Sequence, residues 1–174
     1  MKILIVSNLY PPYYIGGYEI RCALVAEGLH QAGHDVRVLT STYGLKPGES
    51  RRHPHEEHNG VPVQRILGQY HYTPTTPSKW PYFIFGARLQ LRDACYFIRI
   101  LDEFKPDVVN WWSTSGLTKA ILPIPHLRGI PDLVWIEDDW IVVERERERE
   151  EDRGGRRGRA SGAQKRSHGA GIRG

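Results

Sequence analysis

Runs of apolar residues, separated by short polar turns, divide most of the chain into alternating strands and helices. Residues 2–6 (KILIV) are nearly all apolar, which is typical of a strand covered on both faces of a parallel sheet. From 17 to 32 the apolar positions recur at helical spacing, and Gly33 ends the stripe. A second apolar strand follows at 36–39, so the chain opens with a βαβ unit.

The remaining pattern continues this alternation. Helical spacing predicts a long helix over 83–104 and a short later helix that Pro123 and Pro125 curtail. Three further strands are predicted, at 61–66, 107–111 and 133–136. Apolar strands that alternate with helices favour an α/β fold, with a doubly wound parallel sheet and helices on both faces.

The character of the chain changes after Val143. Residues 144–174 begin ERERERE and hold one large aliphatic side chain, Ile172, so they cannot bury enough apolar surface to fold alone. We therefore predict a folded domain over 1–143 and a charged, disordered tail over 144–174. The domain has equal numbers of basic and acidic residues, so the net charge of +4 comes from the tail. No specific nucleic-acid binding is expected of the domain, while RNA or acidic lipid bound by the tail stays an alternative.

Targeting signals and cysteines narrow the picture further. No apolar run approaches the ~18 residues of a membrane span, and the start lacks the basic and apolar regions of a secretory signal. We predict a cytoplasmic protein, with association at a membrane surface left open. Cys22 and Cys95 both fall in helical patterns, so they are predicted to be small core residues rather than disulfide partners or zinc ligands.

Three polar segments follow predicted strands, at 8–17, 112–116 and 137–140. Ligands of open α/β sheets bind outside the carboxyl ends of the strands, so we expect these segments to converge. Gly16 and Gly17 stand where the first helix begins. Without Cβ atoms, their N–H groups can approach a phosphate or a sugar at a helix end that favours negative charge. The alternative is that the pair merely turns the chain into the helix.

Three adjacent carboxylates, those of Glu137, Asp138 and Asp139, follow the last predicted strand beside Trp140. Like charges this close raise one another's pKa, which suits general acid–base work or binding of hydroxyl groups. The alternative is that one carboxylate caps the next element and another is solvated.

Other motifs carry less weight. The HPHEEH stretch with His53, His55 and His58 lacks the helical spacing of a zinc site, so a solvated loop is favoured over a metal site. After the first predicted strand there is no G-x-G-x-x-G, and no P-loop is present, which removes the main support for NAD or ATP binding. The tyrosines in 8–17 either pack as a lid on themselves or contact a ligand.

The stretch MKILIVSNLYPPYYIGGYEIRCALVAEGLHQAGHDVRVLT resembles the opening of the family 4 glycosyltransferases, with their YPP-type loop, GG-x-E turn and GH-[DE]-V strand. NGVPVQRI, FKPDVVNWWS and GIPDLVWIEDDW are similar to later landmarks of the same domain, so the resemblance covers 1–143. It implies a GT-B architecture, in which two Rossmann-like domains enclose the active site. It also implies sugar transfer from a nucleotide-diphosphate sugar with retention of configuration, usually without metal and with no cofactor.

The resemblance also implies roles for individual residues. The GG turn lies near the donor phosphates in that family, which points to Gly16 and Gly17. The family's His-Asp pair falls on Glu137 and Asp138, the predicted catalytic residues, and here a glutamate replaces the histidine. Nothing after Val143 resembles the family's C-terminal domain, so the chain is expected to be an acceptor-side, N-terminal domain that is inactive alone. A non-catalytic nucleotide- or sugar-binding module is the alternative. The residues predicted to bind substrate or donor are Asn8, Gly16, Gly17, Ser113 and Trp140.

Overall fold

A computed structural model of the chain describes residues 1–46, 56–68 and 79–136. The chain separates into two compact units, Met1–Trp135 and Ile136–Gly174, and the fold described below is that of the first. The predicted tail at 144–174, and the predicted boundary at 143, lie outside the described residues.

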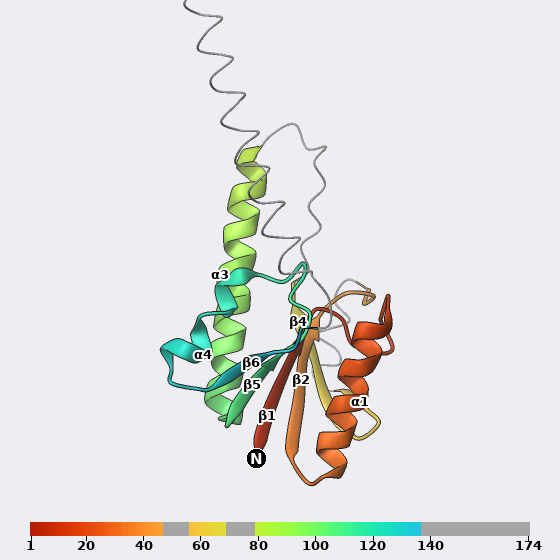
Figure 1. Ribbon diagram of the computed structural model, residues 1–174. Coiled ribbons are helices and arrows are strands. Elements are labelled where there is room, and N and C mark those ends of the chain that lie inside the picture. Colours follow the sequence, from red (N-terminus) through yellow and green to blue (C-terminus); the bar gives the residue numbers. More distant parts are fainter. Residues whose placement is uncertain (47–55, 69–78, 137–174) are drawn as a thin grey trace, which may run out of the picture. The chain divides into compact units, whose positions relative to one another are not determined.

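The first unit is a doubly wound α/β domain of the Rossmann-like type (Figure 1). Its sheet has the order β3-β4-β2-β1-β5-β6, in which β3 alone is antiparallel to its neighbour. The strand order reverses between β1 and β5, because β1 pairs with β2 on one side and with β5 on the other. The elements are β1 (Lys2–Ser7), α1 (Gly17–Gln31), β2 (Asp35–Ser41), β3 (Glu56–His58), β4 (Val61–Leu67), α3 (Lys79–Phe104), β5 (Val108–Trp111), the 3-10 helix η1 (Lys119–Ile121), α4 (Ile124–Leu127) and β6 (Asp132–Val134).

Helices α1 and α3 lie on opposite faces of the sheet, which we call the α1 face and the α3 face (Figure 1). Side chains alternate along β1, so Ile3 and Ile5 pack on the α1 face while Leu4 and Val6 pack on the α3 face. Because both faces are covered, β1 is apolar on both, as its sequence predicted.

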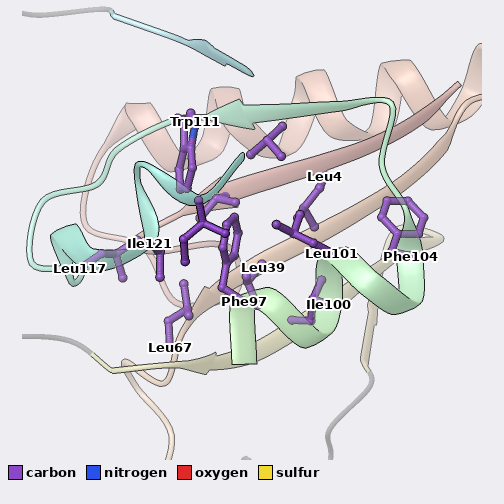
Figure 2. Packing of buried hydrophobic residues seen from close by; sticks show 13 residues of the cluster. Leu4, Leu39, Leu67, Phe97, Ile100, Leu101, Phe104, Trp111, Leu117 and Ile121 are labelled. Carbon is purple, nitrogen blue, oxygen red and sulfur yellow. The ribbon is translucent and has the colours of Figure 1, made fainter. Parts of the chain in front are cut away.

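The α3 face holds the larger hydrophobic cluster (Figure 2). Phe97, Leu101 and Phe104 from α3 meet Leu4 and other strand residues there, and the side chains of Phe97 and Trp111 lie 5.5 Å apart between ring centroids. The α1 face is packed with smaller helix residues, Cys22, Ala23 and Ala26, against the strands. The two helices therefore bury unequal amounts of apolar surface.

Several local predictions need correction. The short strand β3 was not predicted; it pairs with β4 through a turn at Asn59 and Gly60, both of which have positive φ. Helix α3 begins at Lys79, four residues before the predicted 83. The short helix expected before Pro123 is the 3-10 helix η1, which ends at Ile121, but Pro123 and Pro125 also lie at the start of a second short helix, α4, which was not predicted and where a missing N–H costs nothing.

Cys95 is also not a core residue. Cys22 is fully buried as predicted, but Cys95 is exposed on α3. The apolar stripe of α3 runs through Ala94, Phe97 and Leu101, and Cys95 falls beside this stripe.

Candidate functional site

The segments that follow β1 and β5 meet where the strand order reverses. The Asn8 N–H donates to the Ser113 carbonyl at 2.7 Å, and the Trp112 N–H donates to the Val6 carbonyl at 2.9 Å. The two strands thus remain hydrogen-bonded just beyond their carboxyl ends. The structure brings the predicted binding residues Asn8 and Ser113 together at the place where doubly wound folds bind ligands.

Asn8 joins three strands at this point. Its carbonyl accepts hydrogen bonds from the hydroxyls of Thr40 and Ser41, at the end of β2, and its side-chain oxygen accepts one from the Leu9 N–H at 2.7 Å. Only 7% of Asn8 is exposed. Asn8 therefore holds the strand ends together, since most of its hydrogen-bonding capacity is already used within the protein.

The loop from β1 to α1 packs inward at its start and is exposed at its end. Tyr10 is fully buried, and burial raises the pKa of its hydroxyl. Tyr13 packs so closely on Gly44 that a Cβ there would lie 2.3 Å from Tyr13 Cδ1. Tyr14 and Ile15, in contrast, are 51% and 73% exposed. The first part of the loop packs on the protein itself, and the last part faces outward.

The glycine pair opens helix α1 as predicted, but its two residues differ. The Gly16 N–H donates to Glu19 Oε2 at 3.0 Å, so a nearly buried carboxylate already occupies this end of the helix. Gly17 is exposed, and a Cβ on it would meet no atom within 4 Å. Its N–H is among the first of the helix, which have no acceptor within the helix itself. Gly17 therefore offers the more open approach to an anionic ligand.

An aromatic group joins the start of α1 to the end of β6. The buried Trp112 ring stacks on Trp135, with centroids 5.1 Å apart, and meets the Tyr18 ring edge-on at 5.5 Å. The Tyr18 hydroxyl also donates to the Trp135 carbonyl. The chain segments after β1, β5 and β6 are thus held together up to Trp135.

The remaining predicted site residues lie outside the described residues. These are the predicted catalytic pair Glu137 and Asp138, and the predicted binding residue Trp140. Of the three loop histidines, His58 is described; its Nε2 lies 3.9 Å from Glu27 Oε1. The roles of these residues stay predictions.

Two buried charged residues near the site were not singled out from the sequence. Glu19 was visible as the fourth residue of the GG-x-E turn, which is the spacing of a helix-capping carboxylate. Arg65, 2% exposed, lies two residues after Val63 and four after Val61, and all three are buried on the same side of β4. A charged residue on the apolar face of a strand signals a buried interaction, although the sequence does not name its partner.

The sheet, with its order reversed between β1 and β5, defines a Rossmann-like domain, a fold whose ligands bind at the carboxyl ends of the strands. Residues 16–169 match the family described as a glycosyl transferase 4-like domain. The chain belongs to this family, as its resemblance to the family 4 glycosyltransferases predicted.

Two curated proteins are similar to the chain. An uncharacterized glycosyltransferase of Methanocaldococcus jannaschii is 32% identical over 135 residues, covering 75% of this chain and 30% of that protein. An uncharacterized 42.6 kDa protein from the cps region of Klebsiella pneumoniae is 30% identical over 126 residues, covering 70% of this chain and 32% of that protein. The chain therefore spans about a third of the length of these relatives.

Two solved structures are similar to about three quarters of the chain. MurG of Acinetobacter baumannii has a TM-score of 0.49 and 16% identity, covering 76% of this chain and 34% of that one. The glycosyltransferase SsfS6 of Streptomyces sp. SF2575 has a TM-score of 0.45 and 18% identity, covering 77% and 38%.

Within the described ranges, no helix has both the length and the apolar character needed to cross a bilayer. The predicted cytoplasmic location and the association with a membrane surface stay predictions.

Proposed function

We propose that the chain is the N-terminal, acceptor-side domain of a retaining, GT-B type glycosyltransferase that moves a sugar from a nucleotide-diphosphate sugar to an acceptor. Membership of the glycosyl transferase 4-like family supports this chemistry. The observation that carries the proposal is the exposed Gly17 at the N-terminus of α1, one residue before Tyr18, whose ring contacts Trp112 at the end of β5. A helix N-terminus favours negative charge, and a diphosphate supplies it.

The physical contribution of this domain is positioning and charge stabilisation. When a sugar leaves its nucleoside diphosphate, negative charge grows on the departing phosphate oxygen. Backbone N–H groups fixed before the reaction stabilise such a charge without rearranging. Gly17 supplies a donor of this kind, while the hydrogen-bonded segments at Asn8 and Ser113 hold the crevice in place. We assign Glu137 and Asp138 to the reacting end of the acceptor or the sugar, on the family resemblance alone.

We further propose that this chain does not transfer sugar by itself. It spans about a third of the relatives it matches, and the donor site of the family is divided between two domains. A cleft that cannot close leaves the transition state exposed to water.

The test is donor binding by the full chain, measured by calorimetry with UDP-glucose, GDP-mannose and ADP-glucose. Gly17→Ala is expected to weaken binding of the preferred donor at least tenfold, because its methyl group fills the space that a phosphate would use. Gly28→Ala is the matched control, since Gly28 lies on the same helix and a Cβ there also meets no atom within 4 Å. If none of the three donors binds, or if Gly28→Ala weakens binding as much, the donor-site proposal is wrong.

A non-catalytic sugar- or nucleotide-binding module is the second candidate, because an exposed helix N-terminus at Gly17 suits a bound phosphate whether or not a reaction follows. It predicts that a free sugar or a free nucleotide binds as tightly as the nucleotide sugar. Measured turnover by the chain alone, followed as release of nucleoside diphosphate, would contradict both this candidate and the inactivity proposed above.

A further inference from the structure

Arg65 is a buried side chain, and each of its three guanidinium nitrogens donates a hydrogen bond within the protein. It reaches from β4 to the loop that leads into α1, where Nη1 donates to the Tyr10 carbonyl at 2.9 Å and Nη2 donates to the Pro11 carbonyl at 2.5 Å. Its Nε donates to Glu56 Oε1 at 2.5 Å. The planar guanidinium group of an arginine directs its N–H donors at fixed angles to several acceptors at once, which the single ammonium group of a lysine does not do.

The same group also holds the ring of the next loop tyrosine. The centre of the guanidinium lies 5.2 Å from the ring centroid of Tyr13, which is close enough for a cation–π contact. The same ring also packs on Gly44. Arg65 thus touches the loop at Tyr10, Pro11 and Tyr13, and it touches no residue of α1 in these contacts.

The exposed end of the loop is fixed by contacts at two points, its anchors. Residues 14–17 are exposed. The first anchor is Tyr13, which contacts Arg65, and the second is Gly16, whose N–H donates to Glu19. Only Tyr14 and Ile15 lie between these anchors, so a shift at Tyr13 is passed on to the glycine pair.

We infer that Arg65, held by Glu56, is a positioning residue: it fixes the start of the β1–α1 loop and thereby sets where the Gly16–Gly17 bend presents its N–H groups. The inference deepens the proposed function and rests on it as far as ligand binding is concerned. We do not assign Arg65 to ligand binding, because only 2% of it is exposed and each of its three nitrogen atoms already donates a hydrogen bond within the protein. Its effect on a ligand therefore passes through the loop.

The experiment uses the full chain labelled with ¹⁵N and compares the amide resonances of Gly16 and Gly17 in three variants. Arg65→Lys keeps the charge and loses the fork, and Glu56→Gln removes the carboxylate that orients it. Arg99→Met is the matched control, since Arg99 donates to Glu103 in an exposed pair on α3. We expect the Gly16 and Gly17 resonances to move in the first two variants and to stay in place in the control.

Binding of UDP, GDP and ADP to the same samples gives a second readout. The best-bound nucleotide is expected to bind Arg65→Lys at least tenfold more weakly than it binds the unmodified chain. Glu56→Gln is expected to weaken binding too, by a smaller factor. A merely structural role would lower the melting temperature and leave both the glycine resonances and the affinity unchanged, and that result overturns the inference. If no nucleotide binds the unmodified chain, the proposed donor site fails, while the glycine resonances still decide whether Arg65 positions the bend.

Discussion

The two faces of the sheet differ in how they treat polar groups. In the described part of the chain, four buried side-chain atoms lack a hydrogen-bond partner: Ser7 Oγ, Tyr10 Oη, Asn110 Oδ1 and Trp112 Nε1. All four belong to the α1 face. Ser7 is two residues after Ile5 on β1 and Asn110 pairs with Ile5, so both point to the side of Ile5. Tyr10 and Trp112 pack in the cluster of that face. The α3 face has none of them and holds the larger apolar cluster.

This difference indicates that the α3 face mainly stabilises the domain, while the α1 face carries the candidate site. Burying a polar atom without a partner costs free energy, so a face built only for stability avoids it. The α1 face accepts this cost around the carboxyl ends of β1 and β5, where Asn8 and Ser113 meet. The α3 face supplies the stability that makes the cost tolerable.

The largest expected effect comes from breaking the α3 face. Phe97 is fully buried against Trp111 in the centre of that cluster (Figure 2). Phe97→Ala is expected to lower the free energy of unfolding by about 3–5 kcal/mol, because it removes buried apolar surface and leaves a cavity. Urea denaturation followed by circular dichroism measures the loss. Leu91→Ala on the same helix is the control; Leu91 is 67% exposed, so a change of about 0.5 kcal/mol or less is expected. Equal losses would contradict the assignment of the core to this face.

A smaller effect concerns the buried charge of the α3 face. Asp93, fully buried on α3, accepts a hydrogen bond from the Gly68 N–H at 3.0 Å. Burial raises the pKa of its carboxyl above the usual 3.8, and the hydrogen bond from Arg92 offsets this only in part. The folded protein therefore holds this proton more tightly than the unfolded chain does. Its contribution to stability is complete below the unfolded pKa and is lost as pH rises through the folded pKa.

Asp93→Asn removes this titration and keeps an oxygen for the Gly68 N–H. The variant is expected to show a flatter dependence of unfolding free energy on pH above about pH 4, with a difference of about 1.4 kcal/mol for each unit by which the pKa is raised. Urea titrations at several pH values measure it. If the variant and the unmodified protein have parallel pH profiles, burial of Asp93 does not control this part of the stability curve.

The rules for parallel sheets predicted the scaffold and part of the site. The apolar runs predicted the parallel strands. Because the carboxyl ends of parallel strands lie at one edge of the sheet, the sequence also predicted that Asn8 and Ser113 lie close together, which they do. Strand β3 was not predicted because its sequence, EEH, has no alternation of apolar and polar residues. It is held by pairing with β4 and by the contact of Glu56 with Arg65. Such contacts join two different elements, and periodicity within one element does not reveal them.

The glycine pair shows the same limit on a smaller scale. Spacing predicted that Gly16 and Gly17 begin a helix, and they do. That Gly16 gives its N–H to Glu19 while Gly17 stays open depends on the side-chain position of Glu19. The sequence showed the residues of the bend but could not rank them as donors.

The smallest expected effect tests whether the α1 face carries the unpartnered polar atoms at a cost. Tyr10→Phe removes a buried hydroxyl that has no partner and keeps the ring, which packs edge-on against His58 at 5.7 Å. Because no hydrogen bond is lost, the variant is expected to keep or slightly raise the free energy of unfolding, by up to about 1 kcal/mol. Urea denaturation at pH 7 measures it. A loss of more than about 1 kcal/mol would mean that the hydroxyl has a partner in solution, such as an ordered water, and that the α1 face is better satisfied than its described contacts indicate.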